Sequence, residues 1–152
     1  MAIDSPAASL RHPGIPPITP ENEAYWRGGA EGELRIRRCQ RCRYWVEGSS
    51  PLCPSCWGRD LAPEATSGRG TVHTYSTTYN TNYEAFGAGL VSIALPYTTA
   101  IVELDDQAAL RITTNLVGCD PEEVAIGLRV QVAFEQSGDL YIPLFEPERA
   151  GP

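Results

Sequence analysis

The sequence predicts a mainly β protein in two parts, in which a short helix and a metal-binding ribbon precede a larger β-barrel. Four of the five cysteines form two Cys-x-x-Cys pairs within residues 39–56. Beyond residue 69, segments that alternate apolar and polar side chains recur at short intervals, as in an antiparallel sheet. A chain of 152 residues is long enough for one ordinary domain or two small ones, which agrees with this division.

Residues 1–18 are rich in proline, alanine and serine and show no periodicity, which predicts a flexible arm. A short helix should follow, with Thr19 as its cap, Pro20 in its first turn and a glycine-rich stretch at its end. Tyr25 and Trp26 are adjacent in this helix and therefore project in different directions. Either both rings fold back on their own domain, or at least one of them binds a partner.

The segment ELRIRRC at residues 33–39 alternates like a strand, with Leu34 and Ile36 on one face and arginines on the other. It leads into the first cysteine pair, and a hairpin through residues 48–51 can bring the second pair back to the first. Each pair can present two thiolates to one ion, so the two pairs together close a tetrahedral site. The predicted ligands are Cys39, Cys42, Cys53 and Cys56. We expect the helix and the ribbon to occupy residues 19–66, with residues 59–67 serving as a connector to the next part.

Zinc is the expected metal of this site, because two closely spaced cysteine pairs that close one tetrahedron are typical of zinc ribbons. The ribbon commits all four sulfur atoms and leaves no open position for a catalytic water. The site is therefore predicted to be structural. Iron in a rubredoxin-like electron carrier is the alternative, since the same tetrathiolate geometry holds iron. A colourless protein with one equivalent of zinc would support the first metal, and a red, reducible absorption band would support the second.

All twelve basic residues are arginines, so chemistry that needs a lysine, such as a Schiff base or a P-loop, is excluded. Half of these arginines surround the cysteine pairs. Either they offset the negative charge of the metal-thiolate centre, or they form an anion site for a phosphorylated ligand, because guanidinium groups suit phosphates. The arginines concerned are Arg35, Arg37, Arg38, Arg41, Arg43 and Arg59.

Residues 67–147 predict the β-barrel, with a glycine-rich boundary at residues 67–70 and a short tail at 148–152. The sequence of residues 120–123 combines a helix cap with a first-position proline and a cap-box carboxylate, which predicts one helical turn between strands. Five or six strands are expected, in the segments 70–79, 89–95, 98–105, 108–117, 128–136 and 139–145.

The alternation in residues 128–136 is the clearest of these patterns. It places Val130, Val132 and Phe134 on the buried face of the sheet and polar residues on the solvated face. Five strands with one helical interruption fit an OB-fold, while a small β-sandwich is the alternative on pattern alone.

The charge distribution bears on the possible partners. Residues 1–59 contain eight arginines and six acidic residues (+2), whereas residues 60–152 contain four arginines and thirteen acidic residues (−9). An acidic larger half suits a nucleic-acid backbone poorly. No apolar run reaches the length of a membrane helix and the first residues lack a secretory pattern, so we expect a cytoplasmic protein. No motif frames Cys119 or His73 as a nucleophile or base, so we expect no catalysis by this chain.

Taken together, these features resemble the two-domain proteins that pair a rubredoxin-like zinc ribbon with an OB-fold and associate with acyl-CoA enzymes. The family pattern commonly has a glycine after each cysteine pair, whereas Arg43 and Trp57 take those places here. The resemblance covers roughly residues 20–146, in the segments EAYWRGGAEGEL, LRIRRCQRC, PLCPSC, SGRGTVHTYS, AIVELD and TTNLVGCDPEEVAIGLRVQVAFE.

This resemblance implies a non-catalytic accessory subunit that binds a thiolase-fold enzyme, or a hydratase of the hot-dog type, and helps form its acyl-CoA site. Proteins of this kind occur beside thiolases, acyltransferases and retro-aldolases that shorten CoA-activated steroid side chains. Tyr25, Trp26 and the ribbon arginines are then candidates to contact the partner or the CoA phosphates. A nucleic-acid-binding module is the alternative from another class, because zinc ribbons and OB-folds both serve there.

Overall fold

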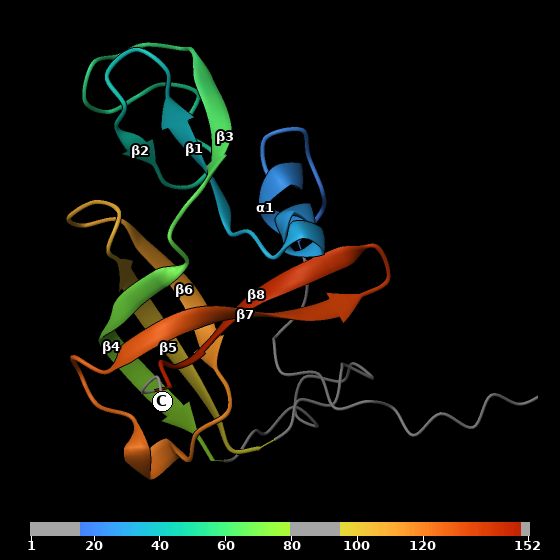
Figure 1. Ribbon diagram of the computed structural model, residues 1–152, viewed down its shortest axis with the longest axis vertical. Helices are drawn as coiled ribbons and strands as arrows, with labels where there is room; N and C mark the ends of the chain where they lie inside the picture. Colours follow the sequence, from blue (N-terminus) through green and yellow to red (C-terminus); the bar gives the residue numbers. More distant parts are fainter. Residues whose placement is uncertain (1–15, 80–94, 150–152) are drawn as a thin grey trace, which may run out of the picture.

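The computed structural model describes residues 16–79 and 95–149, which form a small ribbon above a β-barrel (Figure 1). The helical segments are the α-helix α1 (Glu23–Arg27) and the 3-10 helices η1 (Gly28–Glu31) and η3 (Pro121–Glu123). Within these described ranges no helix is long and apolar enough to cross a membrane. The strands are β1 (Arg35–Cys39), β2 (Trp45–Val46), β3 (Leu61–Ala65), β4 (Arg69–Thr78), β5 (Tyr97–Leu104), β6 (Arg111–Leu116), β7 (Arg129–Ser137) and β8 (Leu140–Pro147).

The N-terminal helix begins later than the sequence predicted. The backbone N–H groups of Asn22 and Glu23 both donate to the carbonyl of Thr19, so residues 19–22 form a turn and α1 starts at Glu23. The Asn22 side chain stabilises this turn, because its Oδ1 accepts a hydrogen bond from the Thr19 N–H at 2.8 Å. The helix tightens into η1 and ends at Gly32, whose φ of 73° is the left-handed conformation that glycine adopts without strain.

The ribbon is a three-stranded antiparallel sheet in the order β2-β1-β3. The predicted alternation in β1 is confirmed, since Leu34 and Ile36 are buried while Arg35 and Arg37 are only half-buried. The segment from residue 59 to 67 was predicted to be a connector, and this was wrong: β3 pairs with β1 along its whole length. Pro63 hid this strand in the sequence, because proline is tolerated only at a sheet edge, where β3 lies.

The barrel closes in the order β4-β5-β6-β8-β7, with antiparallel pairs except between β6 and β8. It confirms the predicted OB-fold. The helical turn is also confirmed, because Asp120 and Glu123 form a reciprocal capping box at η3. Residues 89–94 of one predicted strand lie outside the described residues, as do residues 1–15 of the predicted arm and residues 150–152 of the predicted tail.

Ribbon and barrel share one hydrophobic core. Leu34, Ile36 and Trp45 from the ribbon side pack in one cluster with barrel residues such as Val102 and Phe145. Gln107, in the turn between β5 and β6, reinforces this junction: its side chain accepts from the Trp45 N–H at 2.8 Å and donates to the Trp45 carbonyl at 3.2 Å. The two parts are therefore held together by burial as well as by hydrogen bonds.

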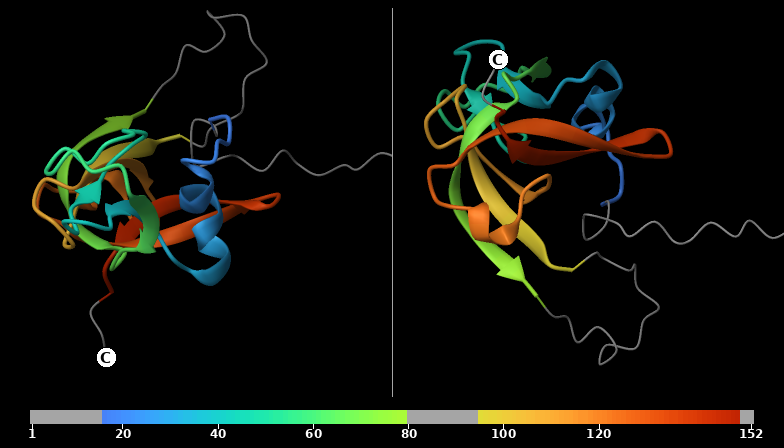
Figure 2. Two further views of the ribbon diagram at one scale, coloured as in Figure 1. Left: turned by 90° about the horizontal axis from the view of Figure 1, so that it is seen from above. Right: turned by 60° about the horizontal axis from the view of Figure 1, so that its bottom comes forward.

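The β7–β8 hairpin extends beyond the barrel and supports the N-terminal helix (Figure 2). For this reason the predicted burial fades along β7: Val130 is fully buried, whereas Val132 and Phe134 are only half-buried. Phe134 lies below η1, where a Cβ added to Gly29 would come within 2.6 Å of its ring and 2.4 Å of the Tyr141 Cβ. Only glycine fits at this contact.

Replacing Gly29 by alanine should therefore push the helix off the hairpin. We expect the free energy of unfolding to fall by about 1–3 kcal/mol, as for other overpacked sites. Urea denaturation would measure this change. Ala30→Ser, an exposed neighbour on η1, is the control and should change stability little; an unchanged Gly29→Ala protein would show that the helix does not rest on the hairpin.

Candidate metal centre and the adjoining cleft

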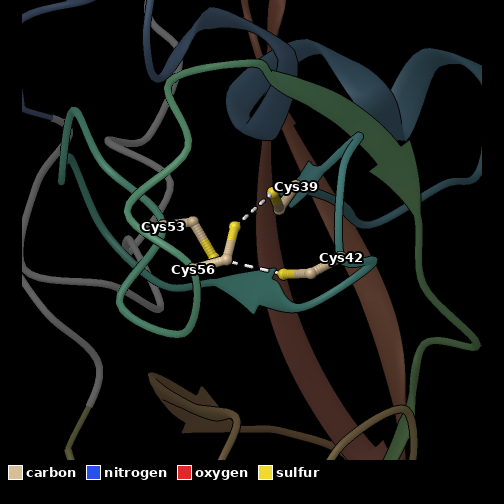
Figure 3. Close-up of side chains that lie close together, drawn as sticks. All are labelled: Cys39, Cys42, Cys53 and Cys56. Atoms are coloured by element: carbon tan, nitrogen blue, oxygen red, sulfur yellow. Dashed lines mark hydrogen bonds between the residues drawn. The ribbon is translucent and has the colours of Figure 1, made fainter.

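The four cysteines converge at one end of the ribbon (Figure 3). Their sulfur atoms all lie within 4.8 Å of one another, with 3.6 Å between Cys39 and Cys56 and 3.5 Å between Cys42 and Cys53. A zinc ion with Zn–S bonds of about 2.3 Å would place tetrahedral sulfurs ~3.8 Å apart, so these spacings fit a single ion. The four cysteines could therefore hold a metal ion, as the sequence predicted.

Two equivalent loops position the sulfur atoms. In the first loop the Arg43 N–H donates to the Cys39 carbonyl, and in the second the Trp57 N–H donates to the Cys53 carbonyl, both at 2.9 Å. Arg43 has a φ of 66° and Trp57 a φ of 60°, in the left-handed region that favours glycine. The absence of glycine noted in the sequence therefore leaves the loop geometry intact, at the cost of backbone strain in both loops.

The electrostatics of the cluster also favour a cation. The Tyr44 N–H donates to the Cys42 sulfur and lowers the pKa of this thiol to about 6, and the Cys42 N–H likewise lowers the pKa of Cys39. The Gly58 N–H acts in the same sense on Cys56, but the side chain of Cys42, burial and the other thiols outweigh it and raise the pKa of Cys56 to about 12. Cys56 therefore keeps its proton until a bound cation compensates the negative charge of the neighbouring thiolates.

Glu64 on β3 organises the arginines near the first loop. Its carboxylate accepts hydrogen bonds from Gln40 at 3.0 Å, Arg43 at 2.7 Å and Arg38 at 3.4 Å. These donors, Gln40 first, lower the pKa of Glu64 to about 2. Because this folded-state pKa lies below the ordinary value of ~4.3, the contacts stabilise the ribbon above about pH 4.3 and are lost as the pH falls toward 2. Arg38 also stacks on Trp45, with 4.7 Å to the ring centroid.

A cleft of about 560 Å³ lies between α1, the ribbon and β6. Its apolar lining includes Tyr25, Trp26 and Ile36, and the two aromatic rings meet edge to face with centroids 5.0 Å apart. Burial raises the pKa of Tyr25 to about 12, so its hydroxyl remains a hydrogen-bond donor at neutral pH. The cleft has the apolar wall and the few polar groups that are typical of a ligand site.

The charged lining of the cleft is mixed. Arg35 is neutralised by Glu31 and Glu33, both at 2.8 Å. Arg37 donates to the carbonyl of Gly48 and makes no ion pair with a described residue. Glu21 and Glu47 also reach the lining. Arg37 is therefore the available cation of this cleft.

The structure divides the predicted binding residues into three groups. Tyr25, Trp26, Arg35 and Arg37 line the cleft, Arg38 and Arg43 are held by Glu64, and Arg41 stays exposed without a described partner. Sequence reasoning missed Glu64, which lies in the overlooked strand β3. It also missed Ile112 and Thr113, which reach the cleft from the barrel and carried no local signal.

Neither of the two reactive residues outside the cluster joins these sites. Cys119 is half-buried against the barrel core before η3, and burial together with Glu123 and Asp120 raises the pKa of its thiol. His73 is exposed at an irregularity of β4 between Val72 and Thr74.

A four-cysteine ribbon joined to an OB-fold barrel defines a two-module class of protein. Within this class the chain belongs to the DUF35 family. It is 36% identical over 100 residues to a DUF35 domain-containing scaffold protein of Methanothermobacter thermautotrophicus, covering 65% of this chain and 69% of that protein. Residues 64–135 also match the family model of the C-terminal OB-fold domain of ChsH2. The resemblance inferred from the sequence is thereby confirmed.

Two further proteins are similar to this chain. A probable enoyl-CoA hydratase alpha subunit of Thermomonospora curvata is 30% identical over 133 residues, which are 87% of this chain but only 39% of that subunit. The fold is similar to a chain of the structure described as the Ltp2-ChsH2(DUF35) aldolase, with a TM-score of 0.73 and 28% identity. That match covers 88% of this chain and 98% of the other.

The two strained loop positions give a matched test of the ribbon. Trp57→Gly should stabilise the metal-loaded protein by up to ~1 kcal/mol, because it relieves strain and loses no side-chain hydrogen bond or ring contact with a described residue. Arg43→Gly relieves similar strain but loses the Glu64 contact, so its gain should be smaller or absent. Urea unfolding of both variants would compare them. A larger gain for Arg43→Gly would contradict the strain argument.

Proposed function

We propose that this chain is a non-catalytic accessory subunit, which binds a thiolase-fold acyl-CoA enzyme and helps form its acyl-CoA site. The observation that carries the proposal is the match to the Ltp2-ChsH2(DUF35) aldolase, because it extends over 98% of the corresponding chain. The first candidate for the partner is an aldolase, for example one that shortens steroid side chains. The second candidate is an acyltransferase. The description of a DUF35 relative as a scaffold protein supports the accessory role.

The cleft is the part of the chain that would contribute to the shared site. Tyr25 and Trp26 offer an apolar wall for the acyl or pantetheine portion of a thioester, and Arg37 offers a cation to its anionic portion. Neither Cys119 nor His73 lines this cleft, which supports leaving the chemistry to the partner.

Zinc fits the cysteine cluster, and Cys39, Cys42, Cys53 and Cys56 would hold it. When bound, it supplies a structural crosslink between the two loops. Cys39, Cys53 and Cys56 form a separate small core with Val46 and Leu61, so the ribbon has little apolar surface of its own to keep it folded.

The match to an enoyl-CoA hydratase alpha subunit favours a second candidate, in which the partner is a hydratase. The two candidates share the accessory role and differ in the enzyme recovered with the chain. Affinity purification of the tagged full-length chain from its own cells, with identification of the bound proteins by mass spectrometry, would decide between a thiolase-fold enzyme and a hydratase. Recovery of neither enzyme would reject the accessory role.

Removal of one cysteine ligand tests whether the metal is structural rather than catalytic. We expect one zinc per wild-type chain by elemental analysis, and Cys39→Ser should lose the metal, unfold the ribbon and abolish assembly. The isolated wild-type chain should show no turnover of acyl-CoA substrates. Stoichiometric iron with a red absorption band, or measurable turnover by the chain alone, would contradict this assignment.

Changes in the cleft should affect the assembled enzyme. Arg37→Ser in the complex should raise the KM for acyl-CoA about tenfold or more, as expected for the loss of a charge-assisted hydrogen bond. Arg111→Ser is the matched control, because Arg111 lies on the barrel and pairs with Glu103 away from the cleft. Equal KM values for the two variants would remove Arg37 from the acyl-CoA site.

A further inference from the structure

Trp57 has a strained backbone, and its side chain makes no hydrogen bond or ring contact with a described residue. Its φ of 60° is left-handed, and its side chain is 74% exposed. Arg43, at the equivalent place in the first loop, offsets similar strain by its 2.7 Å contact with Glu64. Trp57 has no such contact with any described residue. A bulky residue kept in a costly conformation on the surface indicates a use outside the chain.

Two arginines accompany this indole. Arg41 lies against the second loop, since a Cβ added to Gly58, the neighbour of Trp57, would lie 3.9 Å from the Arg41 Cδ. Arg59 follows two residues after Trp57. Within the described residues these are the two ribbon arginines that make neither an ion pair nor a hydrogen bond through their side chains, and both are exposed. Asp60 is the acidic residue next to them and is also exposed. We call Arg41, Trp57 and Arg59 the ribbon tip.

The shape and the charge of this surface select the kind of partner. The ribbon tip lines neither the cleft described above nor a smaller one between Tyr44, Ser50 and Leu110, whereas small ligands bind in concave sites. Two arginines on a chain of net charge −7 provide little for a nucleic-acid backbone. Exposed tryptophan and arginine side chains together are typical of the residues that dominate protein interfaces.

We propose that the ribbon tip is a docking surface for the partner enzyme, and that it inserts Trp57 into an apolar socket bordered by carboxylates. Arg41 and Arg59 then pair with those carboxylates at the rim. This surface is separate from the cleft, so the chain would hold the partner at one site and contribute to the acyl-CoA pocket at another. The inference rests on the accessory role proposed above.

The test uses the full-length, metal-loaded chain and the purified thiolase-fold enzyme recovered with it. Trp57→Gly removes the indole and relieves the backbone strain, so a loss of binding cannot be attributed to unfolding. Ile126→Ser is its control, because Ile126 is 71% exposed on the barrel. Arg41→Ser with Arg59→Ser tests the charges, and Arg149→Ser is the control for an exposed arginine outside the ribbon. Isothermal titration calorimetry at two salt concentrations would give each dissociation constant.

We expect the affinity of Trp57→Gly to fall at least about 30-fold and that of the double arginine variant about tenfold, with a weaker dependence on salt. Both controls should bind like the wild type. Unchanged affinities with an intact complex would overturn the docking surface and leave the accessory role standing, with the arginines only offsetting the charge of the cysteines. Failure of the wild-type chain to bind any thiolase-fold enzyme would reject both proposals. Salt-sensitive retention on single-stranded DNA that depends on Trp57 would replace the protein partner by a nucleic acid.

Discussion

The position of strand β1 is the constraint on which the rest of the structure depends. Ile36 and the adjoining Leu34 enter the core shared with the barrel, while Cys39 at the end of the strand enters the small cysteine core. Because side chains alternate along a strand, a shift of one residue would turn the apolar residues outward and move the first ligand away from its partners. Burial in the barrel thus fixes the register of β1 and places Cys39, and β2 and β3 follow by pairing with β1 on either side.

This arrangement explains why the ribbon tolerates unusual loops. Two non-glycine residues in the left-handed region add strain to a module whose own core is small. The shared core and the Gln107 contacts to Trp45 hold the base of the ribbon from the barrel side. A metal ion bound by the four sulfurs would hold its far end. The ribbon therefore depends on support at both ends more than on its internal packing.

The sequence was sufficient for the features that depend on local pattern. The cysteine spacing, the alternation of β1 and the capping box at η3 each depend on residues that are close together in the sequence, and the structure agrees with each. It was insufficient where distant segments decide the outcome. Strand β3 exists because β1 offers it a partner, and Phe134 is half-buried because the hairpin leaves the barrel. The cleft is formed by α1, the ribbon and β6, and the sequence around Ile112 does not indicate that this residue lines it.

The arginines show how far composition can mislead about binding capacity. Six of them surround the cysteines in sequence, which suggests an extensive anion site. In the structure, Glu64 neutralises Arg38 and Arg43, and two further carboxylates neutralise Arg35. Each neutralised guanidinium stabilises the ribbon and loses its attraction for a ligand. The ribbon arginines that form no ion pair with a described carboxylate lie in two separate places, Arg37 in the cleft and Arg41 with Arg59 at the ribbon tip. This separation supports the proposal of two independent contacts, one to an acyl-CoA substrate and the other to a partner protein.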